Sequence, residues 1–502
     1  MVKTLATMLE ALQGQVGILE SRGNLHVPVR AITDDSRTVS AGSLFVAVKG
    51  EQVDGHQFIP AALRAGMAAL VTEQAAADLS IPFVRVTDSR KAVGFLGSRF
   101  YGEPSSQLRM IGVTGTNGKT TTTYLCKSML ETLGRQVGLI GTVAYQIGKK
   151  TIPASHTTPG ALELQQLLAQ MVAGGCTTAV MEVSSHALAQ DRTSGCEYDV
   201  AVFSNLTQDH LDFHKSMEEY FQAKLRLFTG LTGTHKPNKR AIVNADDPSG
   251  SRITQLCPAP VWTYALKAKA DLRAEDVRLS LGGTTFTAAT PAGSFPIESQ
   301  LVGEHNVYNL LAAIGVALDE GATPDQIRQA IGQVTNVPGR FERVTAGQRF
   351  TVVVDYAHTE DALVRLLTAA QALKVGRIIT VFGCGGDRDR GKRPKMGRAA
   401  VQYSDVVILT SDNPRTEDPL SILQEVEAGV IDALRQRLHV EYRKVADRRE
   451  AIGVAMREAR PGDMVLIAGK GHEDYQIIGT QKFHFDDREV AREAIEQLST
   501  CA

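Results

Sequence analysis

The sequence predicts an α/β protein of three domains: a small α/β domain, a central P-loop type domain on a parallel-rich sheet, and a Rossmann-like C-terminal domain. Three observations carry this prediction. The chain has 502 residues, and a domain usually has ~150. Short apolar runs alternate with helical patterns, which is typical of parallel sheets covered by helices. Distinctive polar residues follow many of these runs, where open α/β sheets bind ligands.

The first domain is expected over residues 1–104. An apolar run at 43–48 predicts a strand, residues 59–70 have helical spacing, and 69–71 predict a second strand. Gly, Pro and Ser residues at 101–106 predict a linker to the next domain.

The central domain is expected over 105–336 and the C-terminal domain over 337–502. Nine apolar runs predict their strands: 110–113, 137–140, 179–181, 200–203 and 241–243, then 352–354, 378–382, 406–409 and 465–468. The polar residues that follow these runs are Thr114, Gly115, Glu182, Asn205, Asp355, Gly383, Asp412 and Gly469. Their repeated placement predicts two facing ligand sites.

Composition excludes several classes of protein. The chain is 43% hydrophobic with a formal net charge of -1, so it lacks the basic excess of a nucleic-acid binder. No apolar run approaches the ~18 residues of a membrane helix, and Glu10 and Gln13 interrupt the segment where a signal peptide would be apolar. We expect a cytoplasmic protein without membrane insertion or nucleic-acid partner. Its six cysteines, without a CxxC pair, predict buried thiols.

Residues 112–121, GVTGTNGKTT, predict a phosphate-binding loop between a strand and a helix. Glycines let backbone N–H groups approach phosphate oxygens, and Lys119, expected in a solvent-facing loop, supplies positive charge. Thr120 or Thr121 can reach Mg²⁺. Val113 stands where the strict Walker pattern has glycine, so an ordinary Gly-rich turn is the alternative.

Hard oxygen and imidazole side chains gather after two further strands. Glu182 ends one run, and Asp209, His210, Asp212 and His214 follow another. Mg²⁺ beside a nucleotide needs one or two such ligands besides phosphate and water. A zinc site at His210 and His214, or helix capping by Asp209 or Asp212, are the alternatives.

Lys224 lies in a predicted helix over 216–228. It falls inside an apolar stripe made of Met217, Tyr220, Phe221, Leu225 and Phe228. Burial lowers the pKa of an ammonium group, so one interpretation is a neutral, nucleophilic amine. The alternative is a lysine that extends to water from the edge of the stripe.

Six motifs together resemble the Mur ligases of peptidoglycan synthesis, over nearly the whole chain. They are 114–121 (TGTNGKTT), 182–186 (EVSSH), 209–212 (DHLD), 303–309 (GEHNVYN), 338–340 (PGR) and 355–358 (DYAH). Segments 34–37 (DDSR), 412–415 (DNPR) and 469–473 (GKGHE) resemble the members that add the third amino acid of the muramoyl peptide. The DNPR form is associated with meso-diaminopimelate rather than L-lysine.

The resemblance implies an ATP-dependent amide ligase with two Mg²⁺ ions, expected to be a monomer. It would join meso-diaminopimelate to the D-glutamyl γ-carboxylate of UDP-N-acetylmuramoyl-L-Ala-D-Glu through an acyl phosphate. An L-lysine-adding homologue, a folylpolyglutamate-synthetase-like ligase and a non-catalytic nucleotide-switched module are the alternatives. The N-terminal domain and the DNPR segment weigh against the folate enzyme. Retention of Lys119, Glu182, His210 and Lys224 together weighs against the module.

The resemblance also implies residue roles. Lys119, Glu182, His210 and Lys224 would be catalytic. ATP would contact Gly115, Thr116, Asn117, Gly118, Lys119, Thr120, Thr121, Asn306, Arg340 and Asp355. The UDP-muramoyl dipeptide would contact Ser36, Glu51, Gln52, Val53, His156, Thr157, Thr158, Ser184, Gln190 and Arg192. Metal ligands would be Thr120, Glu182, His210 and Lys224, the last as a carbamate (N6-carboxylysine).

For diaminopimelate, the implied contacts are Arg388, Asp412, Asn413, Pro414, Arg415, Gly469 and Glu473. Arg388 and Arg415 would grip carboxylates, because a guanidinium can form two parallel hydrogen bonds. Asp412 and Glu473 would take the distal ammonium. The alternative for Arg415 is a proline-anchored turn that faces solvent.

Overall fold

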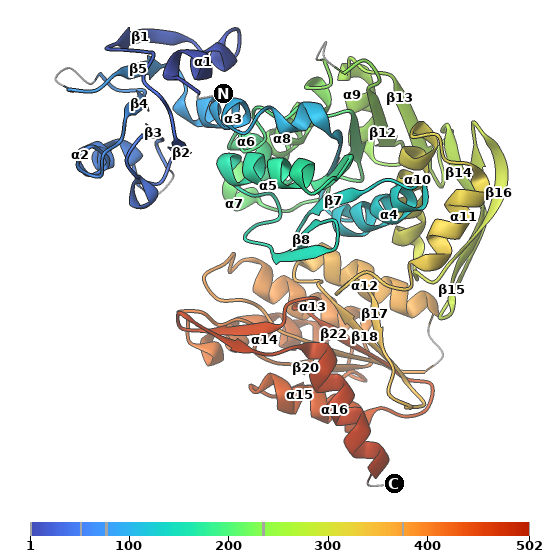
Figure 1. Cartoon of the computed structure of the whole chain (residues 1–502). Helices are drawn as coiled ribbons and strands as arrows, with labels where there is room; N and C mark the ends of the chain where they lie inside the picture. The colour runs from blue at the N-terminus through green and yellow to red at the C-terminus, as the bar shows by residue number, and fades with distance from the viewer. Residues whose placement is uncertain (1–2, 51–52, 76–78, 233–235, 374–375, 501–502) are drawn as a thin grey trace.

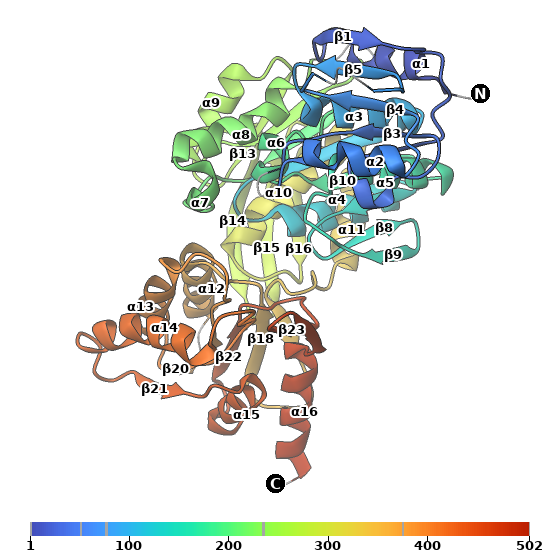
Figure 2. The same cartoon turned by 90° about the vertical axis from the view of Figure 1, so that its left-hand side faces the viewer.

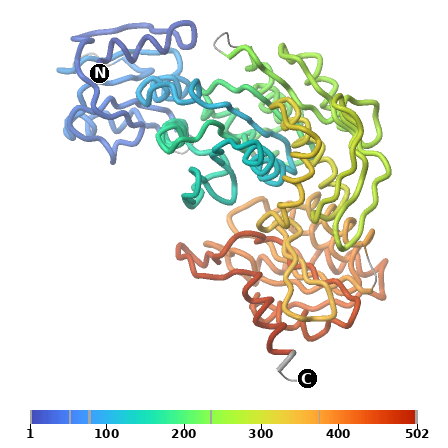
Figure 3. The backbone as a smooth tube through the Cα atoms, turned by 45° about the vertical axis from the view of Figure 1, so that its right-hand side comes forward, coloured from blue at the N-terminus to red at the C-terminus, as the bar shows by residue number. Residues whose placement is uncertain are grey.

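The computed structural model describes residues 3–50, 53–75, 79–232, 236–373 and 376–500. Three main sheets follow one another along the chain, each with its own helices (Figure 1). The orange C-terminal part lies below the central part in the turned views as well, whereas the blue N-terminal part lies beside the upper central part in Figure 3 and in front of it in Figure 2. The three-part α/β architecture expected from the sequence is therefore observed.

The N-terminal sheet has the order β1-β5-β4-β3-β2, with only β1 antiparallel to its neighbour among the described strands. Its elements are β1 (Ile18–Arg22), β2 (Ala31–Thr33), β3 (Ser43–Val46), β4 (Ala69–Thr72), β5 (Phe83–Val86), α1 (Leu5–Leu9), α2 (Ile59–Arg64) and α3 (Ser89–Phe100). The helix α2 is shorter than its apolar spacing predicts, because Gly66 turns the chain with φ +89°. A 3₁₀ helix, Pro104–Gln107, occupies part of the expected linker.

The central sheet has the order β16-β15-β14-β13-β12-β11-β6-β10-β7-β8-β9 within the described residues. Its strands are β6 (Arg109–Thr114), β7 (Val137–Ile140), β8 (Ala144–Ile147), β9 (Lys150–Pro153), β10 (Thr178–Glu182), β11 (Val200–Phe203), β12 (Arg240–Asn244), β13 (Val261–Ala265), β14 (Leu272–Ser280), β15 (Gly283–Thr290) and β16 (Gly293–Ser299). The middle strands are parallel, and hairpins extend both edges. The sequence pattern missed these hairpin strands.

Helices cover both faces of the central sheet. They are α4 (Lys119–Thr132), α5 (Ala161–Ala173), α6 (Ser185–Ala189), α7 (Leu211–His214), α8 (Met217–Thr229), α9 (Pro248–Leu256), α10 (Glu304–Asp319) and α11 (Pro324–Gln333). Alternate residues of β6 divide between two cores: Ile111 packs with α4 and α10, and Met110 with α5 and α8. Because successive residues of a strand face opposite sides of the sheet and both sides are apolar cores, each strand is a continuous apolar run in the sequence.

The C-terminal sheet has the order β17-β18-β22-β19-β20-β21 and is parallel except for β17. Its strands are β17 (Glu342–Val344), β18 (Thr351–Asp355), β19 (Ile378–Phe382), β20 (Val406–Leu409), β21 (Glu441–Lys444) and β22 (Met464–Ala468). Its helices are α12 (Glu360–Leu373), α13 (Lys392–Tyr403), α14 (Pro419–Leu434), α15 (Arg448–Glu458) and α16 (Asp487–Thr500), and β23 (Tyr475–Ile478) with β24 (Gln481–His484) forms a hairpin.

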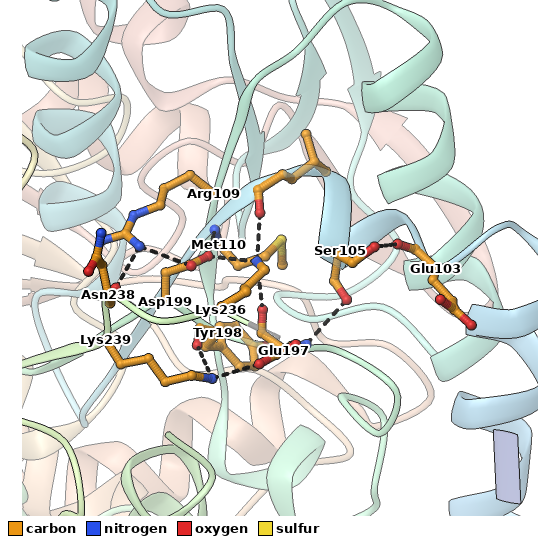
Figure 4. A network of polar contacts seen from close by, with 12 residues as sticks. Glu103, Ser105, Arg109, Met110, Glu197, Tyr198, Asp199, Lys236, Asn238 and Lys239 are labelled. Carbon is orange, nitrogen blue, oxygen red and sulfur yellow. Dashed lines mark hydrogen bonds and ion pairs between the residues drawn. The ribbon is translucent and has the colours of Figure 1, made fainter. Parts of the chain in front are cut away.

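An ion-pair network fastens the amino ends of the central strands (Figure 4). Arg109 at the start of β6 pairs with Asp199 at 2.9 Å, and Lys236 pairs with the same carboxylate at 2.7 Å. Lys239 pairs with Glu197 at 2.9 Å. The network borders an open groove of about 950 Å³. It lies at the edge of the sheet opposite to the carboxyl strand ends.

No helix within the described ranges is both long and apolar enough to cross a membrane. The five described cysteines are free thiols. Cys126, Cys176 and Cys384 are buried, as expected, whereas Cys196 and Cys257 are partly exposed, so the expectation of burial is wrong for these two.

Candidate active site

The loop 115–118 joins β6 to α4 with backbone shapes that require glycine. Gly115 has φ +150°, and a Cβ there would lie 1.9 Å from Ser204 Oγ. Gly118 has φ +88°, and a Cβ there would lie 2.4 Å from Asn309 Oδ1. The glycines therefore let a tight strand-to-helix loop form at a helix N-terminus, the arrangement that suits phosphate.

Lys119 does not lie in a solvent-facing loop, as the sequence analysis expected. It is the first residue of α4 and is half-buried. Its Nζ donates to Gly115 O and Thr116 O, both at 2.9 Å, because the tight turn folds the side chain back over the loop. Desolvation lowers the pKa of Lys119, against the opposing effect of Glu182.

Glu182 and Thr120 meet because β10 pairs with β6 in parallel. Thr120 Oγ1 donates to Glu182 Oε1 at 3.0 Å, and Thr142 donates to the same carboxylate through its N–H at 2.8 Å and its hydroxyl at 3.1 Å. The sequence analysis missed Thr142, since it stands in an irregular stretch without a motif. These hard oxygens beside a phosphate-type loop suit Mg²⁺.

Lys224 projects from α8 into the protein. Its side chain is 1% exposed, and its Nζ donates to Gly115 O at 2.8 Å. Burial, reinforced by Lys119, holds its pKa well below the usual range. The alternative of a lysine reaching water is therefore wrong. Met217 is 37% exposed at the start of the helix, so it does not belong to the buried stripe.

His210 stands with φ +54° at the N-cap of α7, without a side-chain capping bond. Its ring packs 4.7 Å from that of His186, centroid to centroid, and its side chain is 43% exposed. Asp209 accepts from the His210 N–H at 2.8 Å and does not cap α7; the side chain of Asp212 lies outside the described residues. Within the described part of the chain, no three His, Cys, Asp or Glu side chains form a metal-binding group.

Four of the residues expected at the muramoyl dipeptide are joined by hydrogen bonds. Thr158 Oγ1 donates to Glu182 O at 2.8 Å and accepts from the Ser184 N–H at 3.0 Å. Arg192 donates to Thr158 O at 3.0 Å and to Gln190 Oε1 at 2.9 Å. These four residues therefore lie next to Glu182, whose carboxylate accepts a hydrogen bond from Thr120 at the end of the phosphate-type loop.

The other expected dipeptide contacts divide between two places. Thr157 Oγ1 lies 3.0 Å from Thr142 Oγ1, and Tyr145 donates to the backbone oxygen of His156 at 2.7 Å. Ser36 lies in the 3₁₀ helix Ser36–Thr38 of the N-terminal domain. Val53 belongs to the same domain, and its side chain is 50% exposed. Glu51 and Gln52 lie outside the described residues.

The remaining nucleotide candidates lie where the central and C-terminal sheets meet. A pocket of about 180 Å³ is lined by Asn306 and Arg340 among others. Arg340 donates to Thr120 Oγ1 at 3.1 Å. Asp355 accepts from the N–H groups of Phe341 and Ala357 at 2.7 and 2.9 Å, so it fixes the backbone that carries Arg340.

A second cross-domain contact involves Asp361 on α12, which the sequence analysis missed because no motif contains it. Its Oδ2 accepts from Asn117 Nδ2 at 2.9 Å and from Thr207 Oγ1 at 3.0 Å. The phosphate-type loop is therefore tied directly to the C-terminal domain.

The residues expected at diaminopimelate gather at the carboxyl ends of β20 and β22. Asn413 Nδ2 donates to Glu473 Oε2 at 2.8 Å, and Lys470 lies between Asp412 and Glu473. Gly469 has φ +118°, and a Cβ there would lie 3.2 Å from Asp412 Oδ2. Pro414 O lies only 1.8 Å from where a Cβ on Gly386 would be, so the two loops are tightly packed.

Arg415 has φ +52° and donates to Gly386 O at 2.8 Å. It is half-buried, so the alternative of a turn that faces solvent does not describe it. Arg388 is exposed and donates to Asp387 O at 2.9 Å. Both arginines border Gly385.

The central domain has a nucleotide-type loop. A second α/β domain carries charged residues at its strand ends and contacts that loop. Together these features define a class of nucleotide-dependent enzyme. Three family models match the chain: "Mur ligase family, catalytic domain" over 28–101, "Mur ligase middle domain" over 113–317 and "Mur ligase, glutamate ligase domain" over 339–471. The chain belongs to the Mur ligase family.

Relatives within the family are similar over nearly the full length. Proteins of Geobacter metallireducens and Geobacillus kaustophilus, both named UDP-N-acetylmuramoyl-L-alanyl-D-glutamate--2,6-diaminopimelate ligase, are 46% and 49% identical. The matches cover 98% and 93% of this chain and 99% and 95% of the relatives. A solved structure of a ligase of that name has a TM-score of 0.71 at 35% identity, covering 99% of this chain and 100% of its own.

Proposed function

We propose that the protein is an ATP-dependent ligase that joins meso-2,6-diaminopimelate to the D-glutamyl γ-carboxylate of UDP-N-acetylmuramoyl-L-Ala-D-Glu. The full-length similarity to ligases of that name supports this proposal. The observation that carries it is the link between two sites, since Arg340 and Asp361 of one domain contact Thr120 and Asn117 of the other. The cytoplasmic location and the monomeric state stay predictions from the sequence.

The reaction brings a carboxylate against a triphosphate, which are both negatively charged. The N–H groups of loop 115–118, the N-terminus of α4 and Lys119 supply compensating positive charge. The γ-carboxylate oxygen attacks the terminal phosphorus and ADP leaves. The incoming amine then attacks the carbonyl carbon of the acyl phosphate, inorganic phosphate leaves, and the nitrogen loses a proton to give the amide. Two domains held over one site exclude the water that would hydrolyse this intermediate.

Mg²⁺ fits the residues present. Thr120, Glu182, His210 and Lys224, the last as a carbamate, would hold two ions, because they offer hard oxygens and one imidazole around the loop. The ions would neutralise phosphate oxygens. Lys224 suits carbamate formation, since its buried amine is shifted toward the neutral form that reacts with CO₂.

Selectivity for the amino acid would come from opposite charges at the ends of β20 and β22. Arg415 and Arg388 suit the distal carboxylate, whereas Asp412 and Glu473 suit the distal ammonium. L-Lysine has no second carboxylate for Arg415, so it would leave that guanidinium unpaired.

The test is phosphate release with ATP, Mg²⁺, UDP-N-acetylmuramoyl-L-Ala-D-Glu and a panel of amino acids. We expect turnover with meso-diaminopimelate and little with L-lysine, and mass spectrometry should find the tripeptide product. Turnover with L-lysine instead would favour the lysine-adding alternative, and turnover with a folate substrate would favour the other rival.

A further inference from the structure

Lys470 is a fully buried lysine in the loop after β22, and the sequence analysis gave it no role of its own. Its side chain is 0% exposed. Its Nζ donates to Asn413 Oδ1 at 2.9 Å and to Tyr475 O at 2.6 Å. It also lies 3.3 Å from Asp412 Oδ1 and 3.6 Å from Glu473 Oε2. A lysine is seldom buried in this way unless it is paired.

These contacts fix the orientation of the Asn413 amide. An ammonium group only donates hydrogen bonds, so the amide oxygen must face Lys470. The N–H of Ile477 reaches the same oxygen at 2.9 Å. The amide nitrogen is then directed at Glu473 Oε2, 2.8 Å away. One lysine therefore aligns two side chains of the expected amino-acid site.

Lys470 also sets the charge of the cluster. Asp412 and Glu473 provide two carboxylates, whereas Arg448 nearby is already paired with Asp487 at 2.6 Å. Burial alone would raise the pKa of Asp412, but Lys470 and Arg448 lower it overall. Among these three side chains, one ammonium against two carboxylates leaves one negative charge; burial and Asp412 raise the pKa of Glu473, whereas Lys470 and Arg415 lower it. That surplus suits one ammonium group of the incoming amino acid, the distal one.

We propose that Lys470 is a positioning residue for the incoming amino acid: it orients Asn413 and Glu473 and neutralises one of the two carboxylates, so that the other receives the ammonium of the substrate. This inference rests on the proposed function. Lys470 itself touches no substrate, because its side chain is enclosed.

The test is Lys470→Met, which keeps the length of the side chain but removes its charge and donors. The KM for meso-diaminopimelate should rise by about tenfold or more, since a buried charged hydrogen-bond network is lost. The KM values for ATP and for the UDP-linked dipeptide should stay within about twofold. Lys482→Met is the matched control, because Lys482 is exposed and lies 4.3 Å from the Tyr475 ring; it should change none of the three.

A purely structural role would behave differently. Loss of folded enzyme lowers kcat and leaves all three KM values alone, and that result would overturn the proposal. If Lys470→Met does not fold, the double variant Lys470→Met/Asp412→Asn is compared with Asp412→Asn. The Asp412→Asn substitution removes a carboxylate that the loss of Lys470 would leave without its ammonium partner. An unchanged amino-acid KM in that pair, or failure of both Lys470 variants to fold, also overturns it. A wild-type enzyme that forms no amide would instead contradict the proposed function.

Discussion

At the residue scale, two buried or half-buried lysines converge on one backbone oxygen. Lys119 and Lys224 both donate to Gly115 O, at 2.9 and 2.8 Å. Burial favours the neutral form of Lys224, and repulsion from the nearby ammonium group of Lys119 adds to this effect. The two lysines therefore have different expected chemistry: Lys119 supplies charge, and Lys224 supplies a reactive amine.

Lys119→Ala should abolish ATP-dependent amide formation, because it removes the ammonium group that lies over the phosphate-type loop, 2.9 Å from Gly115 O and Thr116 O. The circular dichroism spectrum should stay native, since α4 tolerates alanine at its first position. Lys127→Ala is the control on the same helix; Lys127 pairs with Glu131 and should be dispensable. Near-normal turnover of Lys119→Ala would refute the phosphate role.

Lys224→Arg should reduce activity by several orders of magnitude, because a guanidinium cannot form a carbamate. With ¹³C-bicarbonate, wild type should show a carbamate signal by NMR that Lys224→Arg lacks. Lys239→Arg serves as control, since Lys239 is buried but paired with Glu197 at 2.9 Å. An unmodified amine in metal- and substrate-loaded wild type would contradict the expectation.

Arg415→Ala should weaken discrimination between meso-diaminopimelate and L-lysine. An arginine left without its carboxylate in a closed site costs ~2–4 kcal/mol, or roughly 30- to 1000-fold in selectivity. The measurement is kcat/KM for both amino acids in wild type and variant. A wild-type preference for lysine, or an unchanged preference in the variant, would show that Arg415 does not select the substrate.

At the element scale, the phosphate-type loop depends on glycine for two separate reasons. Gly118 needs a positive φ, and it also needs space, because a Cβ would meet Asn309 Oδ1 at 2.4 Å. Gly134, after the other end of α4, has φ +79° but nothing within 4 Å of a Cβ. A comparison of alanine substitutions at the two glycines therefore separates the cost of backbone strain from the cost of steric contact.

Gly134→Ala should therefore cost about 1 kcal/mol in the free energy of unfolding, the usual cost of alanine at positive φ. Gly118→Ala should cost clearly more and should also weaken ATP binding, since the loop must shift. Denaturant unfolding and titration calorimetry with an ATP analogue measure the two effects. Equal costs in both variants, with ATP affinity retained, would contradict this account.

At the scale of the whole molecule, polar contacts join the phosphate-type loop of the central domain to the C-terminal domain, and beside them Val302 of the central domain packs into the apolar core of the C-terminal domain. Asp361 joins Asn117 and Thr207, while Arg340 reaches Thr120. A ligase must admit and then enclose its substrates, so we expect the two domains to move about this contact during turnover.

Asp361→Ala should loosen the C-terminal domain from the central one. We expect the two domains to unfold at more separated temperatures in calorimetry, with roughly 1–3 kcal/mol of coupling lost. Asp432→Ala is the control, because the Asp432–Arg398 pair at 2.9 Å lies within the C-terminal domain. An unfolding profile identical to that of wild type would mean that Asp361 does not couple the domains.

Much of the fold could be predicted from apolar runs, because strands buried on both faces are continuous in sequence. The strand run at 137–140, for example, is β7 itself. The hairpins β8–β9 and β14–β16 could not be predicted in this way, since half of their residues face solvent and the apolar pattern is broken. Thr142 and Asp361 were missed because their partners are distant in sequence.

The sequence by itself determined the fold class, the phosphate-type loop and the family, because these depend on local motifs and on periodic burial. Only the tertiary structure decided the states of the side chains. It showed Lys224 enclosed against Gly115, Lys119 folded back over its loop, and Lys470 between two carboxylates. Burial and hydrogen bonding arise from contacts between distant segments, and desolvation by those contacts lowers the pKa of Lys119 and of Lys224.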